Sequence, residues 1–142
     1  MLRFTYPVKL TRDRKDGGYV VSCRDLPEVI TQGESVEDAL SGAEGALQAA
    51  IEARVQDGLD IPAPSRAKQG ERMVSTPITT ALKAAVYLAM REDGVSKSEL
   101  ARLMQVNEKE ARRMLDPHHP TRVPTLERAL AVLGRRAAIA VS

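Results

Sequence analysis

SKSELARLMQVNEKEARRMLD, residues 96–116, is the stretch that decides the fold of the second half of this 142-residue chain. Apolar residues recur in it at steps of three and four, which predicts two short helices over residues 97–104 and 108–115. Only residues 105–107 separate them, so the chain must turn sharply. The sequence therefore predicts a helix-turn-helix, a motif whose second helix enters the major groove of DNA.

Both predicted helices begin with a capping box. Ser96 is followed three residues later by Glu99, and Asn107 is followed three residues later by Glu110. Such side chains satisfy backbone N–H groups that the start of a helix leaves unpaired. Gln105 stands at the turn position where many such motifs carry glycine, which predicts a looser turn than average.

The second predicted helix has an apolar and a polar side. If its apolar residues point inward, its charged residues lie outward, where base edges and phosphates would be. Arginine can pair with guanine, asparagine with adenine, and lysine suits phosphate. The simpler alternative is an ordinary solvated surface. The candidate DNA-binding residues, which include the start of the first helix, are Ser96, Lys97, Asn107, Glu108, Lys109, Arg112 and Arg113.

The distribution of charge favours a nucleic-acid partner for the second half. Residues 1–76 contain ten Lys/Arg and twelve Asp/Glu, a net charge of −2, whereas residues 77–142 contain eleven and seven, a net charge of +4. A basic excess is what phosphate binding requires. The single cysteine, Cys23, suits a reducing cytosol, and no apolar run is long enough to span a membrane. The chain is expected to be cytoplasmic.

The first 76 residues predict a small α+β domain. Alternating apolar residues indicate a strand over residues 2–10, in which Pro7 marks either an edge or an outward-facing site. Two more strands are expected at 19–24 and 29–32. A helix over residues 36–56, capped by Ser35, would cover one face of this sheet, and residues 72–75 could add a further strand.

The second domain, residues 77–142, is predicted to be all helical. Pro77 marks the boundary, and the helix-turn-helix is preceded by a supporting helix over residues 78–93. Thr125 can cap a last helix over residues 126–133. The apolar residues 137–141 could form a short strand or an unpaired tail, and an intersubunit strand is one use for them.

Four motifs in this order resemble the HicB antitoxins of bacterial type II toxin–antitoxin pairs. They are D-L-P-E at residues 25–28, S-V-E-D-A-L at 35–40, L-D-P-H-H-P-T at 115–121 and T-L-E-R-A-L at 125–130. The resemblance covers nearly the whole chain. It implies an N-terminal domain shaped like a truncated ribonuclease H fold that masks the toxin HicA, a small RNA-cleaving protein. It also implies a C-terminal domain that binds the operator of its own operon as a homodimer or higher homo-oligomer.

An acidic rim is our hypothesis for how the toxin is masked. A toxin that cleaves RNA must hold phosphates, so its active surface should be basic, and the acidic first domain can complement it. The alternative for Glu37 and Asp38 is that they only favour a helix N-terminus. The rim comprises Asp25, Glu28, Glu34, Glu37 and Asp38, and the candidate toxin-binding residues are Asp25, Leu26, Pro27 and Glu28.

No catalytic, metal or cofactor site is predicted. Ribonuclease H chemistry needs several carboxylates around Mg²⁺, beginning in the first strand, and residues 2–10 contain no Asp or Glu. One of the adjacent residues His118 and His119 is expected to pack or hydrogen-bond where the second helix of the motif meets the last helix. The alternative function is a stand-alone helix-turn-helix regulator whose N-terminal domain senses a small ligand or another protein.

Overall fold

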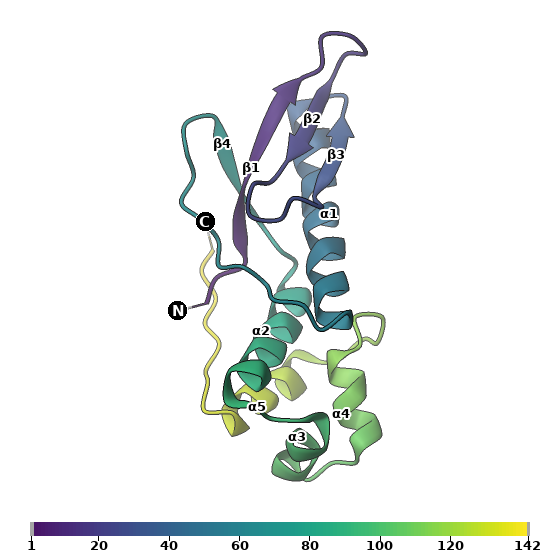
Figure 1. The fold of residues 1–142 in the computed structure, drawn as a ribbon, viewed down its shortest axis with the longest axis vertical. Coiled ribbons are helices and arrows are strands. Elements are labelled where there is room, and N and C mark those ends of the chain that lie inside the picture. The colour runs from purple at the N-terminus through teal and green to yellow at the C-terminus, as the bar shows by residue number, and fades with distance from the viewer. Residues whose placement is uncertain (1, 142) are drawn as a thin grey trace. The chain divides into compact units, whose positions relative to one another are not determined.

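The N-terminal half of the chain forms a four-stranded antiparallel sheet in the computed structural model, which describes residues 2–141 (Figure 1). The strands are β1 (Thr5–Arg12), β2 (Tyr19–Ser22), β3 (Ile30–Gly33) and β4 (Glu71–Ser75), in the order β3-β2-β1-β4. Helices make up the rest of the regular structure, so the predicted α+β fold class is confirmed.

Helix α1 (Val36–Gln56) lies along one face of this sheet, with the bounds that the sequence predicts (Figure 1). Side chains alternate between the two faces of a strand, so every second residue of β1 and β2 can point at the helix. The helix presents Ala39, which is buried, whereas its larger neighbour Leu40 is only half-buried. The core of this unit contains Tyr6, Val8, Val21, Leu26, Val29, Ala39, Ala43, Leu47, Ala50, Ile51 and Val74.

Pro7 lies where the sheet narrows to two strands. Strand β1 pairs with β4 from Thr5 to Lys9 but with β2 only from Lys9 to Arg12. At Pro7 the registers give β1 a partner on one side alone, Met73 of β4. Proline has no N–H to donate, so a local edge suits it, as the sequence predicts. Its side chain is nevertheless fully buried.

The C-terminal half contains helices α2 (Ile78–Asp93), α3 (Lys97–Met104), α4 (Glu108–Leu115) and α5 (Val123–Val132). The bounds of the first three are those that the sequence predicts. Helix α5 begins earlier than expected, and its N-cap is Arg122, which makes no side-chain capping bond, so the prediction of a Thr125 cap is wrong. Pro124 lies in the first turn, where its fixed φ already matches a helix.

The residues after α5 are extended and form no strand within the described part of the chain. Ile139 and Val141 are 70% and 92% exposed. Arg135 fixes the start of this tail, because its guanidinium pairs with the carboxylates of Glu92, at 3.0 Å, and Asp93 at the end of α2. The predicted unpaired tail is therefore what a single chain forms, and an intersubunit strand stays a prediction.

The chain divides into two compact units. One comprises residues 1–54 and 61–77, and the other comprises residues 55–60 and 78–142. Residues 55–60 belong to the helical unit because Tyr87 and Arg91 of α2 donate to the carbonyls of Leu59 and Gly58, each at 2.7 Å. Among residues 2–141, we find no helix with the length and apolar character needed to cross a membrane.

Replacing Gly33 with alanine should destabilise the N-terminal unit. A Cβ at Gly33 would lie 2.3 Å from the backbone nitrogen of Ala39, so β3 and the first turn of α1 would have to separate. Overpacking of this kind costs about 1–3 kcal/mol. Urea unfolding of Gly33→Ala should therefore show a lower midpoint than the parent chain.

Gly45→Ala is the matched control, because a Cβ at Gly45 would meet nothing within 4 Å. This substitution in a helix interior should raise stability by about 0.5–1 kcal/mol. Equal stability of Gly33→Ala and the parent would contradict the close approach of β3 to α1.

Candidate nucleic-acid interface and partner-binding surface

Both helices of the helix-turn-helix begin with the predicted N-caps. The Ser96 Oγ accepts a hydrogen bond from the Glu99 backbone N–H at 3.1 Å, and the Asn107 Oδ1 accepts one from the Glu110 N–H at 2.8 Å. Each bond satisfies one of the N–H groups that have no partner within the helix. The two short helices therefore start at fixed positions.

The turn between α3 and α4 is tight, because Gln105 adopts the left-handed conformation with φ 58° and ψ 42°. The Val106 N–H donates to the Ala101 carbonyl at 2.9 Å, and the Gln105 N–H donates to that of Arg102 at 3.2 Å. These two bonds close a helix end of the type usually made by glycine. The expectation of a looser turn is therefore wrong, and a non-glycine residue carries the conformational cost instead.

The apolar and polar sides of the motif separate as the sequence predicts. Ala101 and Ala111, both buried, keep the two helices free of bulky side chains where they approach one another. Leu100, Met104 and Met114 fill the remaining interior. The candidate DNA-binding residues all lie on the exposed side: Ser96, Lys97, Asn107, Glu108, Lys109, Arg112 and Arg113.

Four of these exposed residues already have partners within the chain. Ser96 and Asn107 are the caps described above. Glu108 accepts a hydrogen bond from the Ser98 hydroxyl and lies 3.9 Å from the Arg112 guanidinium, so its carboxylate links α3 to α4. Within residues 2–141, no carboxylate pairs with Lys97, Lys109 or Arg113. These cations are the ones most available to a ligand.

Sequence reasoning missed a buried charge beneath this surface. Lys83 of α2 is 5% exposed, and its ammonium donates to the backbone carbonyls of Asp116 and His119. The only sequence signal is its position: Lys83 stands three and seven residues before Val86 and Met90 on the buried side of α2. The His118 side chain is exposed, and it is the backbone of these two histidines that carries the bonds in this loop.

The D-L-P-E loop is held from within its own unit. Asp25 accepts hydrogen bonds from the backbone N–H and hydroxyl of Ser65, at 2.8 and 2.6 Å. Leu26 is fully buried. Glu28 pairs with Arg54 of α1 through two bonds of 2.6 and 3.0 Å, and this guanidinium lowers the pKa of the Glu28 carboxyl.

These contacts change how the predicted toxin-binding residues are understood. Leu26 anchors the loop in the core, and Asp25 fixes the segment around residue 65, so the two serve the fold. Pro27 and Glu28 remain exposed on the surface. Among the other acidic residues, the Asp38 carboxylate accepts a hydrogen bond from the Glu34 backbone N–H at 2.9 Å. Asp38 therefore takes part in capping α1.

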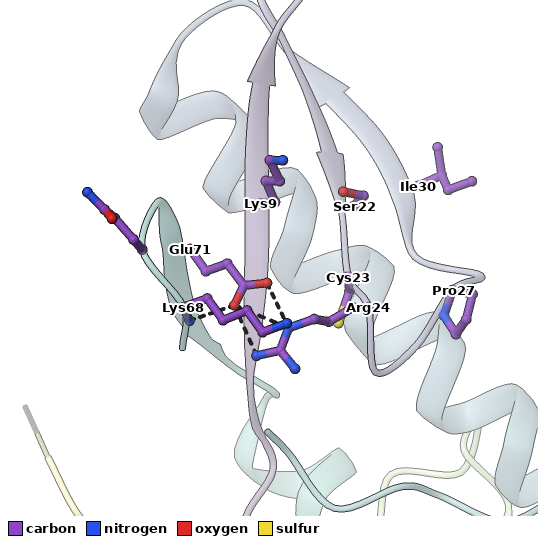
Figure 2. Close-up of a pocket in the computed structure, with 9 residues that line it drawn as sticks. Lys9, Ser22, Cys23, Arg24, Pro27, Ile30, Lys68 and Glu71 are labelled. Carbon is purple, nitrogen blue, oxygen red and sulfur yellow. Dashed lines mark hydrogen bonds and ion pairs between the residues drawn. The ribbon is translucent and has the colours of Figure 1, made fainter. Parts of the chain in front are cut away.

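An open groove of about 480 Å³ lies on the sheet face opposite α1 (Figure 2). Arg24 and Glu71 form a two-pronged ion pair across it, at 3.0 and 3.1 Å, and the Lys68 N–H also donates to Glu71. Arg24 lowers the pKa of the Glu71 carboxyl, and burial raises that of the Cys23 thiol. The groove is lined by Lys9, Ser22, Cys23, Arg24, Pro27, Ile30, Lys68, Gln69 and Glu71.

Comparisons with known proteins agree with one another. A family model described as a HicB-like antitoxin of a bacterial toxin–antitoxin system matches residues 5–85. The protein named Antitoxin HicB from Escherichia coli K12 is 34% identical over 130 residues, which cover 92% of this chain and 94% of that protein. Antitoxin HicB 2 of Photorhabdus laumondii is 35% identical over 92% of this chain and 91% of its own. Antitoxin HicB of Pseudomonas fluorescens is 35% identical over 88% of this chain and 86% of its own.

Replacing Gln105 with glycine should stabilise the helical unit. The left-handed conformation costs a residue with a side chain about 1–2 kcal/mol, and glycine avoids most of that cost. Thermal unfolding of Gln105→Gly should show a higher Tm than the parent. Gln105→Val should lower the Tm, because a β-branched side chain fits this conformation worst. An unchanged Tm in both variants would contradict the left-handed turn.

Proposed function

The chain belongs to the HicB-like antitoxin family of bacterial toxin–antitoxin systems, and from this premise we propose that it neutralises a HicA-type RNA-cleaving toxin and represses its own operon. The N-terminal unit binds the toxin, and the helix-turn-helix binds operator DNA. Both roles are binding roles. We propose no enzymatic one, in keeping with a first strand, Thr5–Arg12, that contains no Asp or Glu.

The observation that carries the DNA-binding proposal is the set of exposed cations on a helix-turn-helix whose two helices are both capped. Arg112 and Arg113 lie in the last turn of α4, on the side away from its buried residues, and Lys109 lies one turn earlier. An exposed arginine can donate two hydrogen bonds to a guanine edge, and an exposed lysine can pair with phosphate. Cations held on a fixed helix can do both in one register.

A dimer is the form in which we propose that the chain binds its operator. Helix-turn-helix dimers recognise two half-sites separated by about one turn of DNA, roughly 34–36 Å, because the two recognition helices enter successive major grooves. The exposed apolar tail that contains Ile139 and Val141 offers a strand for pairing with a second copy. A footprint with two protected half-sites about 10 base pairs apart would support this arrangement.

Arg113→Ala and Arg112→Ala should each weaken operator binding while leaving toxin neutralisation intact. A good base contact contributes about 1–3 kcal/mol of discrimination, so a drop in affinity of roughly 5-fold to 150-fold is expected. Gel shifts or fluorescence anisotropy at several salt concentrations would measure it. If the lost contact is to phosphate instead, the slope of log affinity against log salt falls by about 0.9.

Arg14→Ala is the control for the loss of one positive charge, since Arg14 is exposed in the turn after β1. It should bind the operator like the parent. Parental affinity in both α4 variants would show that α4 is not the recognition helix.

For the toxin-binding half, we propose that the exposed carboxylates beside α1 complement the basic RNA site of the toxin. Glu34 and Glu37 support this because both are exposed, and within residues 2–141 neither carboxylate bonds to another group. Pro27 and Glu28 extend the same proposed surface along the D-L-P-E loop. Asp25 and Leu26 take part only by holding that loop in place.

Reversing Glu34 and Glu37 together to lysine should weaken binding of the co-expressed toxin by about 10-fold or more, because like charges then face each other across the interface. Calorimetry with the purified toxin would measure the affinity. Glu44→Lys, an exposed position farther along α1, is the control for charge reversal and should have a smaller effect. Unchanged affinity in a folded double variant would exclude the acidic rim.

The groove on the sheet face gives little support to the alternative function, a regulator that senses a small ligand. Ligand sites usually enclose most of their ligand within apolar walls. This groove is open, and the Arg24–Glu71 pair occupies it. A short reading frame encoding a basic protein beside this gene would favour the antitoxin, and its absence would favour the regulator.

A further inference from the structure

Lys83 is the buried cation of the helical unit, and it lies at the end of the proposed recognition helix. It projects from α2, is 5% exposed, and donates to the carbonyls of Asp116 and His119. Asp116 is the C-cap of α4, and its N–H donates to the carbonyls of Arg112 and Arg113 at 3.1 and 3.2 Å. The Lys83 ammonium therefore binds Asp116, the residue that ends the last turn of α4, and this turn carries Arg112 and Arg113.

The loop after α4 is shaped around this ammonium. The His119 N–H donates to the Asp116 carbonyl at 3.1 Å, and the His118 N–H donates to the Asp116 Oδ1 at 2.9 Å. These bonds fold residues 116–119 back so that two carbonyls converge on one donor. A cation at this place also opposes the partial negative charge at the C-terminus of a helix.

A lysine is a costly way to stabilise this loop, because removing an ammonium from water costs several kcal/mol and offsets much of what its two hydrogen bonds contribute. What a buried polar contact can supply is a single geometry, because its carbonyls must meet the donor within hydrogen-bonding distance. Lys83 thus adds a constraint that an apolar side chain would not.

The constraint acts where orientation matters most. Helix α4 has eight residues and is about 12 Å long, so a tilt of about 10° moves its far end by about 2 Å. Contacts with base edges are hydrogen bonds and do not survive such a shift. The tight turn at Gln105 and the Asn107 cap fix the N-terminal end of α4. At the other end, Met114 and Leu115 are buried, and the contacts beyond Leu115 add the hydrogen bonds that fix its direction.

We propose that Lys83 is a positioning residue for operator recognition: its ammonium fixes the C-terminal end of α4 and so sets the direction in which Arg112 and Arg113 point. This inference rests on the proposed DNA-binding function. Lys83 itself touches no DNA, because its side chain is buried. Its removal should therefore change affinity without changing the number of phosphate contacts.

Lys83→Met, which keeps the length and apolar stem of the side chain, is the test. In a full-length variant that circular dichroism shows to be folded at the assay temperature, operator affinity should fall at least 10-fold. The slope of log affinity against log salt should match that of the parent, and so should toxin binding. A role in stability alone would leave the affinity of the folded variant unchanged. Lys15→Met, an exposed lysine in the β1–β2 turn, controls for the lost charge and should bind like the parent.

Amide hydrogen exchange tests, without DNA, whether Lys83 fixes the loop after α4. In Lys83→Met, exchange should become faster for residues 115–121 and remain unchanged in the middle of α2. This measurement separates the two proposals. A parent chain that binds no operator would contradict the proposed function, whereas unchanged exchange at residues 115–121 would contradict the positioning role of Lys83. Parental operator affinity in the folded variant also defeats it.

Lys83→Gln decides the matter if Lys83→Met does not fold, since its amide can still donate to a carbonyl. Here too the slope against salt should match the parent while affinity falls, because the shorter side chain cannot reach both carbonyls. Parental affinity in a folded Lys83→Gln would overturn the positioning role.

Discussion

The need to pair backbone groups that regular secondary structure leaves open is the constraint on which most of this structure depends. An unpaired N–H or carbonyl away from water costs as much as a lost hydrogen bond. Ser96 and Asn107 supply acceptors at two helix starts, Asp25 does so for the segment at Ser65, and Lys83 supplies a donor where a helix ends. Polar side chains in both units thus serve the backbone first.

The elements that sequence predicts well are those with local signals. Helices α1 to α4 have the predicted bounds, because each begins or ends at a cap, a proline or a glycine within a few residues of its apolar stripe. The predicted start of α5 is wrong because Thr125 and Pro124 are competing start signals, and the helix begins with the proline in its first turn. The resemblance to the HicB antitoxins, which needs only the order of motifs, is confirmed as family membership.

Contacts between distant residues are what the sequence could not supply. The sequence predicts Asp25 and Glu28 as part of an acidic rim, but it gives no sign of their partners Ser65 and Arg54, which stand 40 and 26 residues away. The burial of Lys83 has the same origin, because the loop that surrounds it follows a different helix. A pattern of residue types can place a side chain on a surface, but only the fold decides whether it is already engaged there.

This distinction decides which charges each unit can offer a partner. A carboxylate or cation bound within its own unit must give up that bond before it binds elsewhere, so it contributes less net free energy than its charge suggests. Glu108 is compensated by Ser98 and Arg112, and Glu28 by Arg54. Within residues 2–141, no such bond engages the cations Lys97, Lys109 and Arg113. The same is true of the carboxylates of Glu34 and Glu37. Because these two groups differ in sign and lie in different units, a basic partner of one unit and an acidic partner of the other would bind different residues.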